Sequence, residues 1–291
     1  LDDGDYIVGD DTRSPSLLEY FARQPDRLIR DYGRNLVLTA TAPFSDQENP
    51  LHMVVGLPVT YFQQWESVLV DRLTGYHKIG VYQPGGHCVR KNIHIRKVHV
   101  VPHPLGTFTS LIMDHKGRLR ASEYNDTKIA LVDVGFRTTD IMVMASGRFC
   151  HRGSSTIEIG LANGFEMVAR KLYQETGIVP DLNRLYRAIR MGFIRIDDQE
   201  YNLEKRCTEM VRHLASTLAD RINYGLKDDW DIERVLLTGG GAADIAEDLA
   251  PRIEGEVILI EHDQDVRLSN AQGQLRLARH IWGASGFCHV G

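Results

Sequence analysis

The stretch from Leu131 to Gly147 constrains the fold more than any other part of the chain. An apolar run over residues 129–132 leads into the polar segment Asp133-Val-Gly-Phe-Arg-Thr-Thr-Asp140, and a second apolar run follows it. Two apolar runs on either side of a glycine-containing turn are typical of a β-hairpin. We therefore predict a β-hairpin with apolar strands and a polar tip.

The predicted tip carries groups that can hold a phosphate. Gly135 lets the backbone come close to an anion, Thr138 and Thr139 offer hydroxyls, and successive turn amides can form an anion-binding concavity. Asp133 and Asp140 can hold Mg²⁺ through its bound waters, because this cation prefers oxygen ligands. For this stretch taken alone, an ordinary hairpin with a polar turn is an equally good interpretation.

A second stretch favours the phosphate interpretation. The apolar strand predicted at residues 234–238 runs into three consecutive glycines, Gly239, Gly240 and Gly241, and a helix is predicted over residues 242–253. A strand that enters a glycine-rich turn before a helix places backbone N–H groups and the helix N-terminus against a nucleotide. A simple turn does not require three glycines, so the triplet indicates a ligand site.

Together the two stretches resemble the phosphate and adenosine motifs of the actin-like ATPase superfamily, which includes actin, heat-shock chaperone ATPases and sugar kinases. The order of elements is most similar to that of the bacterial plasmid-segregation actins of the ParM/StbA type. The resemblance implies an α/β, actin-like (ribonuclease H-like) fold with a nucleotide cleft between two domains. It implies a first domain of residues 1–152, completed by residues 266–291, and a second domain of residues 153–265.

The resemblance also implies ATP or GTP with Mg²⁺ in that cleft, with Asp133 and Asp140 at the metal and in catalysis. Relatives place a Gln or Glu that positions the attacking water where this chain has His103. A histidine can orient or deprotonate water, because its unperturbed pKa lies near physiological pH. It can equally be a surface residue beside two prolines, in which case hydrolysis would be slow.

Further nucleotide contacts follow from the resemblance alone. Gly160 would approach the ribose and phosphates, unless it is only a helix-capping glycine. Arg137 would pair with a phosphate or with a carboxylate. Glu204 and Lys205 would contact the base or ribose from a long helix predicted over residues 203–226, unless they belong to its solvated face.

The superfamily pattern also begins with a first phosphate hairpin that carries an Asp and glycines. Residues 4–9 are instead predicted to form a strand, and we find no such hairpin motif in the sequence. We therefore expect an N-terminal truncation of some tens of residues. Nucleotide affinity is then expected to be low, and the ATPase slow or inactive in this chain.

Composition narrows the classes of protein. The chain has 291 residues, 43% hydrophobic and 25% charged, as expected for two globular domains. The sequence shows neither a signal peptide nor an apolar run of the roughly 20 residues that cross a bilayer, so a cytoplasmic protein without membrane contact is expected.

Dispersed cysteines argue against a zinc site. The net charge of −5 argues against direct nucleic-acid binding, and the basic run Arg90–Lys97 is predicted to be a strand with one solvated face.

The predicted function is that of a nucleotide-dependent filament protein, for plasmid or other DNA segregation or for another cytoskeletal task. Its expected partners are further copies of itself, added head to tail, and a small DNA-binding adaptor protein. The alternatives on the same fold are a sugar or small-acid kinase and a chaperone-type ATPase. A kinase needs an acceptor pocket with an Asp base, and a chaperone usually has an additional peptide-binding domain.

Overall fold

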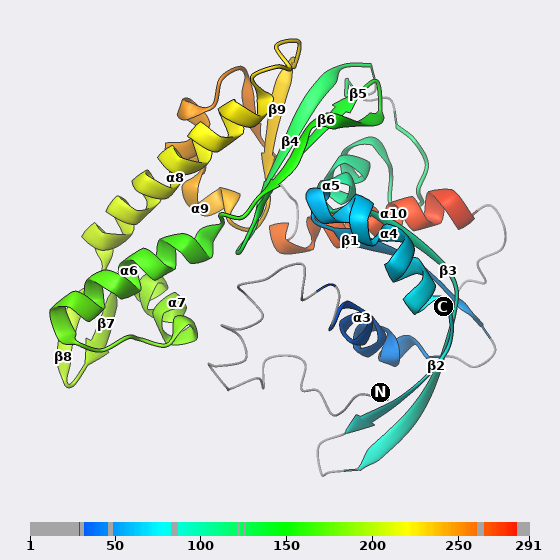
Figure 1. The fold of residues 1–291 in the computed structure, drawn as a ribbon, viewed down its shortest axis with the longest axis horizontal. Helices are drawn as coiled ribbons and strands as arrows, with labels where there is room; N and C mark the ends of the chain where they lie inside the picture. Colours follow the sequence, from blue (N-terminus) through cyan, green and yellow to red (C-terminus); the bar gives the residue numbers. More distant parts are fainter. Residues whose placement is uncertain are drawn as a thin grey trace.

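The computed structural model describes residue 29 and residues 32–45, 49–82, 87–120, 123–124, 126–260 and 265–283. The strand predicted at residues 4–9 lies outside these ranges. The sequence also predicts a helix near residues 17–21 and a turn at residues 84–86, and both lie outside them as well. Within them the chain forms a three-stranded sheet in the order β1-β3-β2, a five-stranded sheet in the order β10-β9-β4-β5-β6, and the two-stranded hairpin β7–β8 (Figure 1). No helix in these ranges is long and apolar enough to span a bilayer.

The first sheet contains β1 (Leu51–Leu57), β2 (Gly75–Tyr82) and β3 (Cys88–Pro102). β1 runs parallel to β3, whereas β2 is antiparallel to it. Helix α3 (Gly33–Thr41) packs against one face of this sheet, where Leu38 contacts the cluster of Ile79, Ile93 and Ile95. Helix α4 (Val59–Leu73) buries Leu69 and Leu73 in a second cluster.

The second sheet confirms the predicted hairpin. Its strands are β4 (Lys128–Val134), β5 (Thr139–Ala145), β6 (Arg148–Ile157), β9 (Arg234–Thr238) and β10 (Val257–Leu259). Side chains alternate between the two faces of a strand. On β4, Ala130 and Val132 therefore lie on one face, and Ile129 and Leu131 lie on the other. The first face packs against α6 (Leu161–Thr176), α8 (Glu204–Leu226) and α9 (Ala242–Leu249). The second face packs against α5 (His103–Ile112). Both faces are covered, which explains why the strands are apolar without a break.

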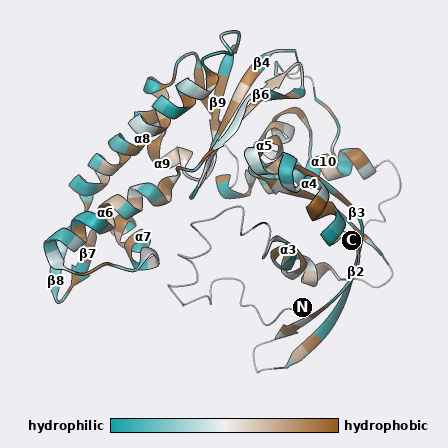
Figure 2. Ribbon diagram, viewed as in Figure 1, coloured by the Kyte–Doolittle hydropathy of each residue, from teal (hydrophilic) through white to brown (hydrophobic). Residues whose placement is uncertain are grey.

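The remaining helices and the small hairpin follow the sequence pattern closely. They are α7 (Leu182–Met191), β7 (Phe193–Ile196), β8 (Gln199–Asn202) and α10 (Ser269–Trp282), with short 3-10 turns at Ala42–Phe44, Ala250–Arg252 and Val266–Leu268. The predicted apolar stripe of α8 is buried at Met210, Leu214, Leu218 and Ile222, and its other side is polar (Figure 2). The helix predicted over residues 242–253 is shorter, because α9 ends at Leu249 and a 3-10 turn continues it.

The boundary expected at residue 152 falls inside β6. It would also separate β4 and β5 from β9, although β4 and β9 are parallel neighbours in one sheet. We therefore propose that the division between the two domains lies before β4. We also propose that the C-terminal helix belongs to the first domain, because the rings of His52 in β1 and Trp282 in α10 pack edge to face at 5.2 Å.

Helices α5 and α10 cross at their backbones. A Cβ atom on Gly273 would overlap the carbonyl of Gly106, and one on Gly106 would overlap the backbone of Asn270. Only glycine lets two helices approach this closely. This crossing fixes the position of Asn270 beside the end of β4.

Candidate functional site

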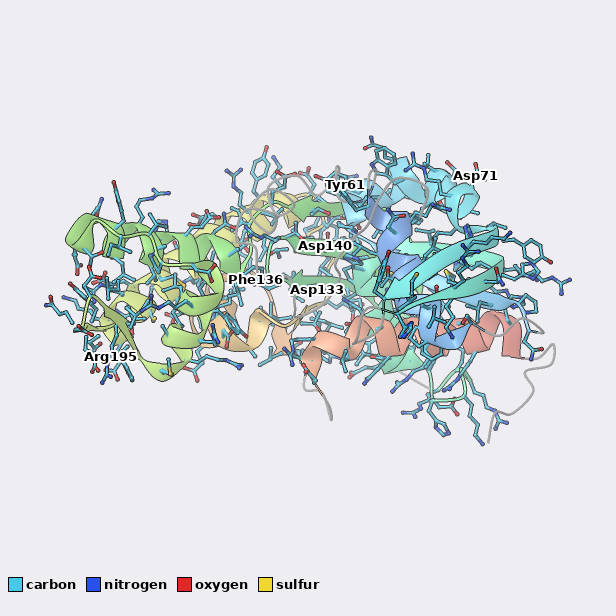
Figure 3. All side chains as sticks on the ribbon, turned by 90° about the horizontal axis from the view of Figure 1, so that it is seen from below. Tyr61, Asp71, Asp133, Phe136, Asp140 and Arg195 are labelled. Carbon is cyan, nitrogen blue, oxygen red and sulfur yellow. The ribbon has the colours of Figure 1, made fainter. Side chains whose placement is uncertain are left out.

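Asp133 and Asp140 lie directly opposite each other in the β4–β5 ladder. Alternation along each strand puts both side chains on the face that α4 and α5 cover, and both are buried. Directly opposed residues of an antiparallel pair have Cβ atoms roughly 4.5–5.5 Å apart. Figure 3 shows the two aspartates in the middle of the molecule, between the helices on one side and the first sheet on the other, with Phe136 of the turn close by.

Asp133 is held by the first turn of α10. Asn270 donates a hydrogen bond from Nδ2 to Oδ2 of Asp133 at 2.6 Å. Its Oδ1 accepts hydrogen bonds from the amide and the hydroxyl of Thr107 in α5, each at 3.0 Å. Burial raises the pKa of Asp133 above its usual value, and the charge of Asp140 adds to this, although the hydrogen bond from Asn270 opposes the shift.

Asp140 caps the start of α4. Its Oδ1 accepts a hydrogen bond from the amide of Val59 at 3.1 Å and one from the hydroxyl of Thr156 at 2.5 Å. Thr60 and Thr156 also exchange two hydrogen bonds, at 3.0 and 2.9 Å, in which each amide donates to the other hydroxyl. Because the first amides of a helix have no partner within the helix, this carboxylate fixes α4 against β5 and β6.

His103 is the first residue of α5, and it meets the aspartates. Its Nδ1 lies 3.5 Å from Oδ2 of Asp140, and its side chain is 39% exposed. Partial burial of the ring lowers the pKa of His103. The hydrogen bond with Asp140, the charges of Asp140 and Asp133 and a hydrogen bond with the Gly56 backbone outweigh this effect, so the pKa is raised above 6.5. A Cβ atom on Gly56 would lie 2.6 Å from Cδ2 of His103, so this glycine makes room for the ring.

The glycine triplet packs against the same end of β4. Gly239 has a φ of +100°, and a Cβ atom there would overlap Oδ1 of Asp133 and lie 2.5 Å from the carbonyl oxygen of Val134. Gly241 donates a hydrogen bond from its amide to that same carbonyl at 2.8 Å. The pairing of Asp133 with Thr238 between the parallel strands explains why the two predicted motifs, about a hundred residues apart in sequence, meet at one edge of the sheet.

The hairpin turn is closed by its own backbone and by the start of α6. The amide of Gly135 donates to the carbonyl of Thr138 at 2.9 Å, and the amides of Leu161 and Ala162 donate to the carbonyls of Gly135 and Phe136 at 3.2 and 2.8 Å. A Cβ atom on Gly160 would lie 2.7 Å from both of those carbonyl oxygens. Gly160 therefore has a packing role against the turn, and its contact with a ribose stays a prediction.

Thr138, Thr139 and Arg137, which were also predicted to contact phosphate, differ in their contacts within the protein. The hydroxyl of Thr139 donates to the carbonyl of Ile159 at 2.9 Å, while Thr138 is half-buried in the turn. Arg137 lies 3.6 Å from Oε1 of Glu166, so its partner in this structure is a carboxylate.

Glu204 and Lys205 are exposed on the first turn of α8, beside the β7–β8 hairpin. Figure 3 shows Arg195 of β7 at the far end of the molecule from Asp133. The structure therefore does not bring Glu204 and Lys205 to the aspartates, and their contact with a base or ribose stays a prediction.

Sequence reasoning missed the groups that hold the aspartates: Asn270, Thr107, Thr156 and the amide of Val59. In the sequence, Asn270 is marked only by the pattern Asn-Ala-Gln-Gly, which resembles an interdomain connector of actin-like proteins. Nothing in the local sequence links it to Asp133, from which it is separated by 137 residues. Only the packing of α10 across α5 creates that contact.

The donor set fits a hard cation and an anion side by side. Two neighbouring carboxylates repel each other, and a divalent cation would relieve that repulsion. Among the described residues no three His, Cys, Asp or Glu side chains form a direct metal-binding group, so a Mg²⁺ ion here would be held largely through water. In that same part of the chain, the amides of Phe136 and Gly240 have no acceptor and can donate to phosphate oxygens.

Comparison with known proteins finds two actin-like families. A family described as "Archaeal actin homologue MreB-like, C-terminal" matches residues 131–251, and one described as "Actin like proteins N terminal domain" matches residues 1–106. No curated protein matches the chain.

Several solved structures share the fold. The archaeal actin homolog Ta0583 superposes with a TM-score of 0.71 at 20% identity, over 89% of this chain and 78% of that one. A ParM filament subunit from Clostridium botulinum gives 0.66 at 22% identity, over 90% and 79% of the two chains, and Alp7A gives 0.66 at 13%, over 90% and 76%. The two family matches and this shared two-domain α/β fold show that the chain belongs to the actin-like superfamily, with similarity to ParM.

Proposed function

We propose that this chain is an actin-like filament protein that binds ATP or GTP with Mg²⁺ at the Asp133–Asp140 site. The observation that carries the proposal is the convergence of the two aspartates, His103 and the glycine triplet at one end of β4. Each of these features has a role at a nucleotide. The amides of Phe136 and Gly240 would donate to phosphate oxygens, and Gly239 would let a ligand approach the strand end.

The two carboxylates would hold Mg²⁺ through its waters, and the bound metal would neutralise charge on the phosphates. His103 would orient the attacking water. The hydrogen bonds with Asp140 and with the Gly56 backbone favour the protonated ring and raise the pKa of His103, and a protonated ring cannot accept a proton from water. Only its neutral form can act as a base, so hydrolysis should be slow and should accelerate as the pH rises through this pKa.

Contacts of the same two aspartates support a coupling between ligand and shape. Asp133 reaches α5 and α10 through Asn270, and Asp140 holds the first amide of α4. A cation that binds either carboxylate, directly or through water, would alter the hydrogen bonds that hold these helices in place. We propose that this shifts the balance between two arrangements of the domains, and that one of them adds subunits head to tail.

The relatives support the proposal at the level of the fold. The Clostridium botulinum ParM was solved as a filament, and a second Ta0583 structure, with a TM-score of 0.69 at 19% identity, is a complex with ADP. By extension we propose that this chain serves DNA segregation, or another cytoskeletal task, and that a small DNA-binding adaptor joins the filament to its cargo.

Right-angle light scattering of the full chain, with phosphate release followed in parallel, tests the proposal. We expect scattering to rise when Mg²⁺ and ATP or GTP are added, and to fall as phosphate appears. Addition of EDTA should abolish both signals, and Asp133→Asn should lose both while remaining folded. Phosphate transfer that requires a small acceptor, without any rise in scattering, would instead assign the chain to the kinases.

A further inference from the structure

The β2–β3 ribbon, defined as residues 75–82 and 87–102, differs in charge from the rest of the chain. It contains Lys78, Arg90, Lys91, Arg96 and Lys97 and no Asp or Glu, although the whole protein has a net charge of −5. Within the part of the chain that the structure describes, none of these five cations has an ion-pair partner. Among the described residues the ribbon is therefore a concentrated positive surface without paired carboxylates.

Strand alternation divides the ribbon into two unlike faces. The inner face carries Ile79, Ile93 and Ile95, which are buried in the cluster that contains Leu38 of α3. The register pairs Tyr76 with His94, Lys78 with Asn92 and Gly80 with Arg90. These pairs and the exposed residues that continue their alternation along each strand define the outer face. It gathers three cations and three ring-bearing side chains: Lys78, Arg90, Arg96, Tyr76, Tyr82 and His94.

The rings of this outer face are presented to solvent. Tyr76 is 81% exposed and Tyr82 is 63% exposed. Tyr76 also stacks on His94, with ring centroids 3.9 Å apart and an interplanar angle of 14°. That stack holds the Tyr76 ring in place on one side, and the exposure of the residue leaves the other side open to a ligand.

We propose that the outer face of the β2–β3 ribbon binds single-stranded nucleic acid. The cations would contact phosphates, and Tyr76 and Tyr82 would stack against bases, which is the combination used by surfaces that bind single strands. An acidic surface of another protein would match the charge but would not need exposed rings between the cations. The inference goes beyond the proposed filament function and does not rest on it.

The net charge and the run Arg90–Lys97 by themselves predict the opposite, because neither shows which strand lies beside this run. The alternation predicted for that run is confirmed, and one of its faces is solvated. Pairing with β2 then adds Tyr76, Lys78 and Tyr82 to the same face. The ribbon gathers five positive charges in one place, whereas the formal charge of −10 on the other residues is spread over the rest of the chain.

Fluorescence anisotropy of a labelled 30-nucleotide single strand, with a duplex of equal length as comparison, tests the proposal. We expect the full chain to bind the single strand more tightly than the duplex at about 50 mM salt and to lose affinity as salt rises. The triple variant Lys78→Glu, Arg90→Glu, Arg96→Glu should lose at least about tenfold in affinity. For this variant, the slope of the logarithm of the binding constant against the logarithm of the salt concentration should become shallower by roughly 2. The reason is that about 0.7 counterions are released for each phosphate contact on a single strand, and three contacts are lost.

A matched control reverses three exposed cations outside the ribbon, Arg170, Arg212 and Arg221, with the same change in net charge. This variant should retain most of the affinity, whereas Tyr76→Ala with Tyr82→Ala should weaken single-strand binding more than duplex binding. Equal losses in the ribbon and control variants would overturn the proposal, as would absence of binding at low salt. Nucleotide turnover and light scattering of the same variants separate this outcome from failure of the filament proposal.

Discussion

The β4–β5 hairpin and the β2–β3 ribbon are both antiparallel pairs, but they differ in what covers their faces. Helices cover both faces of the β4–β5 hairpin, and each of its aspartates has hydrogen-bond donors from other elements. One face of the β2–β3 ribbon packs on α3, while the cations of the other face have no carboxylate partner in the described residues. The comparison shows how burial decides what a charged side chain must have around it.

A buried charge needs partners, because its desolvation otherwise costs several kcal/mol. The partners of Asp133 and Asp140 therefore tie the hairpin to α4, α5 and α10. An exposed charge has no such requirement and can remain available for a ligand. We consequently expect substitutions in the β4–β5 site to alter both stability and activity, and substitutions in the ribbon to alter binding alone.

The largest effect on stability is expected for Gly239→Ala. Its left-handed backbone costs an alanine about 1–2 kcal/mol, and the clash with Asp133 and Val134 adds about 2 kcal/mol more. Gly255→Ala is the matched control, because Gly255 has a φ of +101° with nothing within 4 Å of a Cβ atom, so only the backbone cost applies. Urea denaturation should show the difference. Equal free energies of unfolding for the two variants would contradict the close packing of the triplet on β4.

Asp140→Ala should have the next largest effect. It leaves the buried amide of Val59 without its acceptor, which should lower the free energy of unfolding by about 1–3 kcal/mol. Asp140→Asn keeps an oxygen at that position and should retain most of the stability. Both variants should lose phosphate release if Asp140 helps to hold the metal. Normal phosphate release by Asp140→Asn would remove Asp140 from the proposed site.

A smaller, pH-dependent effect is expected from His103. Its pKa in the folded state is raised above 6.5, so its contribution to stability is complete below about pH 6.5 and is lost as the pH rises through the folded pKa. Comparison of urea denaturation at pH 6 and pH 8.5 should show lower stability at the higher pH. His103→Gln should reduce that difference while leaving the fold intact. An unchanged pH dependence in His103→Gln would show that the interaction with Asp140 is negligible.

The smallest effect on stability is expected in the ribbon. Lys78→Glu with Arg90→Glu should change the free energy of unfolding by no more than about 0.5 kcal/mol, because neither side chain has an ion-pair partner among the residues that the structure describes. Thermal denaturation of this double variant and the wild type measures the difference. A loss of 2 kcal/mol would show that the outer face packs against another part of the protein.

Local patterns in the sequence were sufficient to predict most elements and the two halves of the site. The sequence predicts a hairpin at residues 193–196 and 199–202, because the chain reverses between two short segments, and the bounds of β7 and β8 agree with it. The glycine triplet and the β4–β5 hairpin were also predicted. That these two motifs lie together in space is implied only by the resemblance to actin-like proteins, because no local pattern shows that β4 pairs with β9.

What could not be predicted depends on packing between distant segments. Val59 lies 81 residues from Asp140 in sequence, and its role arises from a backbone amide that carries no signature of its own. The proposed shift of the domain boundary has the same origin, because β6 continues across residue 152 only when it pairs with β5. The nucleic-acid surface likewise depends on the register between two strands and not on either strand alone.

The crossing of Gly106 and Gly273 has a mechanical consequence. Two helices whose backbones touch cannot slide past each other without steric overlap, so α5 and α10 are expected to turn together as one stiff lever. Thr107 and Asn270 sit immediately beside that crossing, at the end of the lever that reaches Asp133. A displacement of a few tenths of an ångström at the carboxylate would thus be magnified along the length of both helices, toward Trp282 at the opposite end.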